Sequence, residues 1–113
     1  MRYALLVCYD ESVEVTAEES SERFASYQAF ADETSAKGLL RDSVRLQPTT
    51  TATNVQVRRG DLVIADGPFA ETKEQIAGFY IVECKDLDEA VEVASRIPGA
   101  SHGTIEVRPV WEM

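Results

Sequence analysis

The polar residues that could carry out chemistry gather in residues 66–75, a stretch of sequence Asp-Gly-Pro-Phe-Ala-Glu-Thr-Lys-Glu-Gln. Asp66 is the first candidate for a general acid or base, because the Gly-Pro turn after it restricts the backbone and burial would raise a carboxyl pKa toward neutrality. Glu71 and Lys73 follow in the same loop. Lys73 could anchor an anionic ligand, and we assign both residues to substrate binding. Structural alternatives stay open: Asp66 could cap the turn and shape a dimer contact, and the charged run could be a solvated loop.

Two further side chains complete the candidate site. His102 is the only histidine of the chain, and imidazole is the side chain best suited to proton transfer near neutral pH, so we assign it a catalytic role beside Asp66. Tyr80 belongs to the apolar run at 76–84, and its hydroxyl could donate a hydrogen bond to a bound ligand. The alternatives are a solvated loop side chain for His102 and a core or interface aromatic for Tyr80.

The sequence lacks the residue patterns of metal and phosphate sites. Cys8 and Cys84 have no metal-ligand spacing, and both lie in apolar runs, so we predict two buried free thiols and no metal site. No glycine-rich phosphate loop and no nucleophile motif is present. We therefore expect no cofactor.

Composition excludes several partners. The chain has 113 residues with 11 basic and 20 acidic side chains, a net charge of −9, which disfavours direct binding to nucleic acid or to an anionic membrane. No apolar run approaches the roughly 20 residues of a membrane span, and the short apolar N-terminus meets acidic residues at once instead of a cleavage site. We expect a cytoplasmic protein with one domain over residues 1–113.

Hydrophobic periodicity and capping residues predict the elements that must position these side chains. Thr16 and Asp86 are predicted helix N-caps, each with a glutamate three residues later. Apolar stripes are expected along both helices, at 24, 27, 31 and 34 in the first and at 87, 90, 91, 94 and 97 in the second. Strands are predicted at 2–9, 39–46, 53–58, 62–65, 76–84 and 104–108, and helices from 16 to about 37 and from 86 to 97.

This order predicts an α+β fold of the ferredoxin-like kind, with an antiparallel sheet and two helices on one face. The run at 2–9 is apolar on both of its faces, so the sheet face without helices needs a cover. A second copy of the chain is the simplest cover, and we predict a homodimer with Trp111 as an interface anchor.

The motif at 66–75, the Gly-Phe-Tyr at 78–80 and both chain ends, residues 1–6 and 105–111, resemble the DGPF branch of the YCII-related family. The resemblance implies a dimeric α+β barrel, a fold also used by muconolactone-isomerase-like and small haem- or quinone-handling proteins. The reaction of the family is not established. Members of this branch tend to be encoded near extracytoplasmic-function sigma factors, which implies a role in stress signalling.

The first helix departs from the family pattern. Smaller relatives carry a histidine in this helix and an aspartate after it, proposed as a catalytic pair, whereas residues 22–31 here contain no histidine. That mechanism does not carry over. Two hypotheses from different classes remain: a cofactor-free enzyme that performs acid/base chemistry on a small molecule near Asp66, and a non-catalytic small-molecule-binding or regulatory dimer.

Overall fold

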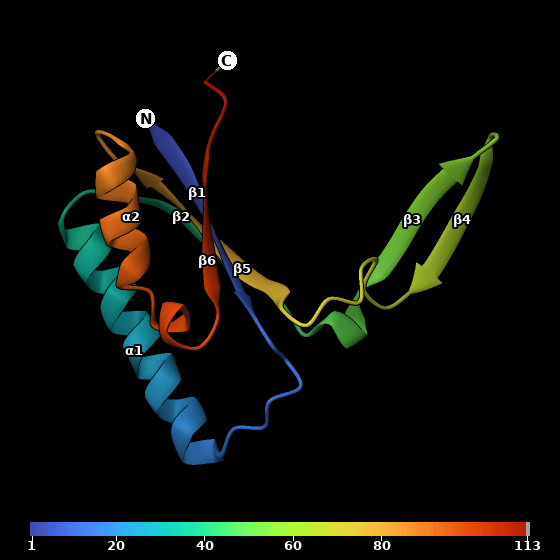
Figure 1. The fold of residues 1–113 in the computed structure, drawn as a ribbon, viewed down its shortest axis with the longest axis horizontal. Coiled ribbons are helices and arrows are strands. Elements are labelled where there is room, and N and C mark those ends of the chain that lie inside the picture. Colours follow the sequence, from blue (N-terminus) through green and yellow to red (C-terminus); the bar gives the residue numbers. More distant parts are fainter. Residues whose placement is uncertain (113) are drawn as a thin grey trace.

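In the computed structural model, which describes residues 1–112, the chain forms six strands, two α-helices and two short 3-10 turns (Figure 1). The elements, in chain order, are β1 (Arg2–Tyr9), α1 (Ala17–Ala36), β2 (Leu40–Arg45), η1 (Thr49–Thr51), β3 (Thr53–Arg58), β4 (Asp61–Asp66), β5 (Gln75–Glu83), α2 (Leu87–Ser95), η2 (Pro98–Ser101) and β6 (Thr104–Pro109). The predicted order of elements is confirmed.

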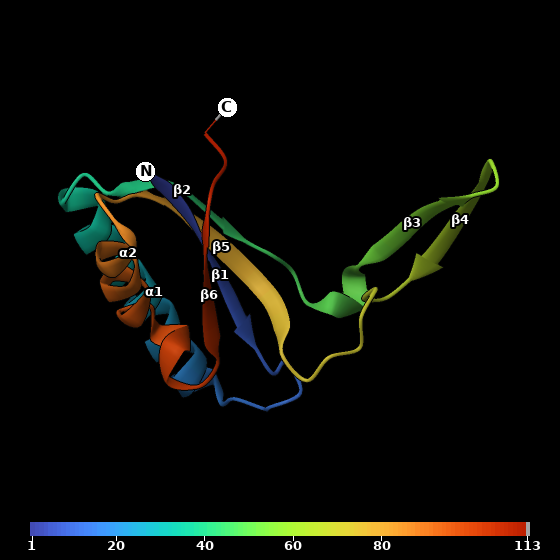
Figure 2. The same ribbon diagram turned by 45° about the horizontal axis from the view of Figure 1, so that its top comes forward.

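Four strands form an antiparallel sheet in the order β2-β5-β1-β6, and β3 and β4 form a separate hairpin. Figures 1 and 2 show α1 and α2 on the same side of the sheet. Tyr3, Leu5 and Val7 of β1 are buried, as are Tyr80 and Val82 of β5. These residues form the core between the sheet and the helices.

The N-caps of both helices are as predicted. The Glu19 N–H donates to Thr16 Oγ1 at 3.0 Å, and the Glu89 N–H donates to Asp86 Oδ1 at 2.9 Å. Each bond satisfies one backbone donor that the first turn of a helix leaves without a partner. Gly38, with φ of 74°, ends α1 in the left-handed conformation that glycine adopts at low cost.

The predicted apolar stripes are wrong in three residues. Phe24 is 63% exposed, because α1 extends past the end of the sheet and its first turns have no element of the core beneath them (Figure 1). The buried residues of α1 are Phe30 and Thr34, about two and three turns further along. In α2, Leu87 and Val91 are each 51% exposed. The buried stripe of α2 consists of Ala90, Val93 and Ala94, at the spacing of one helix face, and Ile97, which follows the helix, is also buried.

The hairpin arm, formed by β3 and β4, projects from the rest of the molecule on the side opposite the helices (Figure 2). One of its faces is apolar: Val55 pairs with Ile64, and Val57 pairs with Leu62. These four side chains are 59–63% exposed. A two-stranded hairpin is only marginally stable in water, so this apolar face lacks the packing that usually supports one.

The sheet face without helices, called the open face below, also carries apolar side chains. Leu6 pairs with Phe79 and Ala4 with Ile81 across β1 and β5. All four are half-buried. A dimeric barrel would require a second chain over this face, and it stays a prediction. Within residues 1–112, no helix is long and apolar enough to cross a membrane.

Candidate functional site

A cavity of about 710 Å³ lies between α1 and the helix-facing side of the sheet. We call it the helix–sheet cavity. Its wall combines residues of β1 and the loop after it, the first half of α1, β2 with the segment that follows, and β5. The lining residues are Val7, Tyr9, Asp10, Glu11, Val13, Val15, Ser20, Ser21, Arg23, Phe24, Tyr27, Gln28, Ala31, Ser43, Val44, Arg45, Leu46, Pro48, Ala77, Gly78, Phe79, Tyr80 and His102.

Tyr80 is held in the cavity wall by the strand register. It lies opposite Leu5 of β1 and Ser43 of β2, and the Phe30 ring packs edge-on against its ring with centroids 5.0 Å apart. Burial, together with the nearby Tyr27, raises the pKa of Tyr80 to about 12. The phenol therefore stays protonated at neutral pH and can donate a hydrogen bond.

Gly78 brings two strands close together at the cavity. A Cβ at this position would collide with the backbone carbonyl of Val44 and lie 3.3 Å from the Cα of Arg45. Glycine is therefore required for β2 to approach β5 here. The next step of the β1–β5 ladder contains a register shift between Val7 and Cys8. These local features set the shape of the cavity wall where Arg45 enters it.

His102 also lines this cavity. It lies at the end of η2, just before β6. Its ring lies 5.8 Å from that of Tyr9, with the two planes tilted by 47°. Partial burial, and to a smaller extent the charge of Arg23, lowers the pKa of His102. Its ordinary pKa of about 6.5 already leaves the ring mostly neutral at pH 7, and the lowered pKa makes the neutral form more dominant.

The hydroxyl of Tyr27 is fully buried and has no partner in full hydrogen-bond geometry within residues 1–112, although the Gly99 backbone N–H lies close to it. Gly99 lies against it, since a Cβ on that glycine would come within 2.7 Å of Tyr27 Oη. Burial is the largest cause of the raised pKa of Tyr27. A buried polar atom without a partner is rare in folded proteins and calls for a physical explanation. A ligand that hydrogen-bonds to this oxygen would provide one.

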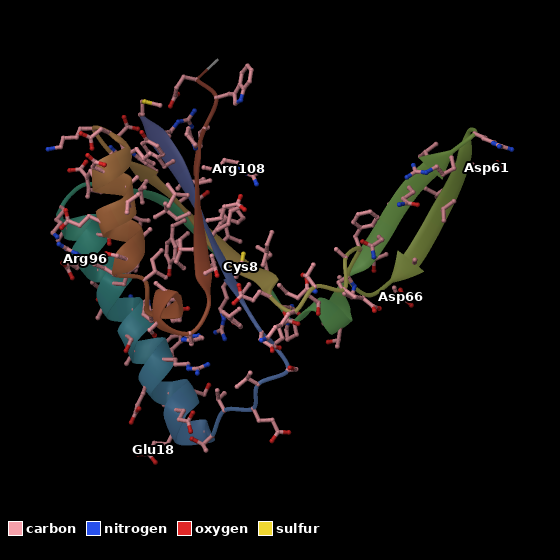
Figure 3. The ribbon with its side chains drawn as sticks, in the orientation of Figure 1. Cys8, Glu18, Asp61, Asp66, Arg96 and Arg108 are labelled. Carbon is pink, nitrogen blue, oxygen red and sulfur yellow. The ribbon has the colours of Figure 1, made fainter. Side chains whose placement is uncertain are left out.

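The structure brings Tyr80 and His102 to one cavity and leaves Asp66 out of it. Asp66 lies at the base of the hairpin arm, on the opposite side of the sheet from the helices (Figure 3). It lines a separate, smaller pocket of about 180 Å³ beside Pro68 and Phe69. Its side chain is exposed.

Glu71 and Lys73 are also exposed and do not line the helix–sheet cavity. Asp10, which lines the cavity, has a lowered pKa. Hydrogen bonds from Ser12 are the main cause, and the positive charge of Lys73 contributes to a smaller extent. Among residues 1–112, no group of three or more His, Cys, Asp or Glu side chains is placed to hold a metal ion. Both cysteines are free thiols.

Hydrogen bonds within the turn at 66–75 do not involve the Asp66 carboxylate. The Gly67 N–H donates to the Ala52 carbonyl at 2.8 Å, and the Asn54 amide donates to the Gly67 carbonyl. Gly67 has φ of 93°, a conformation that favours glycine. Further along the turn, the Thr72 hydroxyl donates to the Glu74 carbonyl, and the Gln75 amide donates to the carbonyls of Ala70 and Thr72. The turn thus owes its shape to its backbone and to the side chains of Asn54, Thr72 and Gln75, and the capping role considered for Asp66 is not observed.

Three groups of the cavity wall, Tyr27, Arg23 and Arg45, were not among the site residues predicted from the sequence. Tyr27 was placed in a buried helical stripe, and a stripe gives no signal that its hydroxyl would lack a partner. Arg23 was absent from the candidates, although it lies one helical turn before Tyr27 and so shares its side of α1. That spacing, together with the expected sheet beneath α1, is the signal that could have found it.

Fold and cavity together define a class: a small α+β protein with an antiparallel sheet, two helices and a ligand-sized cavity beneath one helix. The model of the YCII-related domain matches residues 1–113, and the chain belongs to that family. It is similar to an uncharacterised protein of Rhizobium meliloti (strain 1021), with 41% identity over 114 residues, covering 97% of this chain and 92% of the relative.

Proposed function

We propose that the protein binds a small organic molecule in the helix–sheet cavity and transfers a proton on it, with His102 as base and Tyr80 as hydrogen-bond donor. The supporting observation is that the single imidazole of the chain and a buried tyrosine line the same cavity. A volume of about 710 Å³ falls in the range of small-molecule sites.

The protonation states suit this chemistry. A neutral His102 ring has a free lone pair that can accept a proton from a carbon or oxygen acid. Tyr80 stays protonated, so its hydroxyl can stabilise the negative charge that develops on a carbonyl oxygen of the substrate. Asp66, the residue favoured from the sequence, is not part of this proposal, because it does not line this cavity.

Deuterium exchange tests the proposal without knowledge of the natural substrate. Phenylpyruvate, a small carbon acid, is incubated with the protein in D₂O, and loss of its methylene signal is followed by NMR. We expect exchange above the buffer rate, a decrease of at least about 100-fold in His102→Gln, and a smaller decrease in Tyr80→Phe. Asp61→Asn, at the tip of the hairpin arm, is the matched control.

The variants separate the competing assignments. Full exchange activity in His102→Gln would remove His102 from the chemistry, and a loss in Asp66→Asn would return Asp66 to it. Wild-type protein that binds ligands but exchanges no deuterium would favour the alternative function, a non-catalytic binding or regulatory dimer.

Assembly forms the second part of the proposal: a homodimer through the open face and the hairpin arm. Two unpartnered apolar surfaces on one chain support it, because a twofold pairing covers both surfaces at once. Sedimentation velocity at micromolar concentration tests it. We expect a dimer for the wild type and a weaker dimer for Val57→Lys. Gln56→Lys, on the opposite face of the arm, is the matched control, and a wild-type monomer would disprove the homodimer.

A further inference from the structure

Two arginines of the helix–sheet cavity have no acidic partner. Arg23 comes from α1 and Arg45 from β2, and within residues 1–112 neither forms an ion pair. Arg2, Arg96 and Arg108 are each paired with a glutamate, whereas the exposed Arg41, Arg58 and Arg59, outside the cavity, also form no ion pair within residues 1–112. The chain has 20 acidic and 11 basic side chains, so carboxylates are abundant. Arg23 and Arg45 differ from the other unpaired arginines because both line one cavity, where an anionic ligand would neutralise them.

Both guanidinium groups act on the same end of the cavity. The positive charges of Arg23 and Arg45 each oppose the dominant effect of burial on the pKa of Tyr27. Arg23 also acts on His102. Arg23 lies one helical turn before Tyr27 on α1, and Arg45 lines the same cavity, whose wall also includes Tyr27 with its buried hydroxyl. A single anionic group placed there could accept hydrogen bonds from a guanidinium and from this hydroxyl.

Two carboxylates also line the cavity: Asp10 bonds within its own loop, and Glu11 bonds to Thr49 of η1. Asp10 Oδ1 accepts hydrogen bonds from the Ser12 N–H at 2.9 Å and the Ser12 hydroxyl at 2.6 Å. Glu11 accepts one from the Thr49 hydroxyl at 2.6 Å and others from the Thr49 N–H. Within residues 1–112 neither carboxylate forms an ion pair with Arg23 or Arg45, so they do not neutralise the arginines by direct contact.

The remaining wall suits an apolar, flat ligand body. Phe24 is 63% exposed although it lines the cavity, and Val13 is 61% exposed on the loop opposite. Leu46 adds a third apolar side chain, 45% exposed. Apolar side chains around a few placed polar groups are the usual composition of a small-molecule site.

From these contacts we infer that the ligand of the helix–sheet cavity is a small aromatic or unsaturated organic anion, whose anionic group is held by Arg23 and Arg45 beside Tyr27. Its apolar body lies against Phe24 and the neighbouring aliphatic side chains. This inference deepens the proposed function and rests on it, since it names the ligand class for the same cavity.

Isothermal titration with two probes of nearly identical shape tests the inference. 2-Naphthoate carries a carboxylate, whereas 2-naphthamide is neutral. We expect naphthoate to bind at least about tenfold more tightly than naphthamide, because charge-assisted hydrogen bonds are roughly twice as strong as neutral ones. Arg23→Gln and Arg45→Gln should each weaken naphthoate binding about tenfold and change naphthamide binding less than about twofold.

Arg59→Gln is the matched control, because Arg59 is an exposed arginine of the hairpin arm that does not line the cavity. It should leave both dissociation constants unchanged. The anion assignment would be overturned if the two probes bound equally, or if neither arginine variant weakened naphthoate binding. In both cases the cavity would still be a ligand site. Absence of binding by either probe would also overturn the assignment. His102→Gln in the exchange assay tests the proposed function separately.

Discussion

Alkaline pH should destabilise the protein through Tyr80. This side chain is 8% exposed, and its pKa is raised from 10 in the unfolded chain to about 12 in the fold, chiefly by burial. The unfolded state therefore releases the phenolic proton at a lower pH than the folded state does. Stability from Tyr80 is fully present below pH 10 and is lost as the pH rises from about 10 through about 12.

The size of the effect follows from the two pKa values. With a pKa of 10 in the unfolded chain and about 12 in the fold, ionisation of Tyr80 lowers the unfolding free energy by about 1.4 kcal/mol at pH 11. Well above pH 12 the loss reaches its full value of about 2.7 kcal/mol. Other groups titrate in the same range, so the wild type alone does not isolate Tyr80. Tyr80→Phe keeps the aromatic ring that packs against Phe30 and removes only the ionisable hydroxyl.

Urea unfolding followed by far-UV circular dichroism gives the measurement. The unfolding free energy of wild type and of Tyr80→Phe is determined at pH 9 and at pH 11. The loss between the two pH values should be larger for the wild type by about 1.4 kcal/mol. A difference under about 0.5 kcal/mol would refute the conclusion that the fold keeps this phenol neutral. The difference in tyrosinate absorbance between the two proteins is an independent check.

Three further predictions concern the fold. Asp86→Ala should lower the unfolding free energy by about 1 kcal/mol through loss of the α2 N-cap, and a change under about 0.3 kcal/mol in urea titration would contradict this. Gly78→Ala should destabilise by about 2 kcal/mol or more, because its Cβ meets the Val44 carbonyl. An unchanged thermal midpoint of this variant would contradict the prediction, because it would mean that β2 can move away from the new Cβ without loss of stability. Cys84 is 2% exposed, so in Cys8→Ser a thiol reagent should react only as fast as the protein opens. Labelling at the rate of the urea-unfolded protein would contradict this.

Local sequence signals predicted the elements well, because their physical causes are local. The N-caps at Thr16 and Asp86 need only a short polar side chain and the next three residues. The hairpin at 53–66 follows from alternation around Arg59-Gly60, which both adopt positive φ in the turn. The antiparallel sheet followed from the order of these elements.

Burial along the helices was harder to predict. Phe24 and Phe30 fit equally well on an apolar stripe, since helix periodicity does not say where the neighbouring sheet ends. In the structure, α1 extends past the sheet, so Phe24 faces the cavity and Phe30 packs against Tyr80. The extent of a neighbouring layer depends on contacts between residues distant in sequence.

For the candidate site too, some features follow from the sequence and others only from contacts between distant residues. From the sequence alone came the residue types: one histidine, a tyrosine in an apolar strand, and a polar turn at 66–75 with the mark of the YCII-related family. Only the tertiary structure decided that Tyr80 and His102 line the cavity, and that Asp66 lies at the base of the hairpin arm. The physical reason is that sheet register and the packing of α1 set which distant side chains meet, whereas Asp66 follows a hairpin that leaves the core.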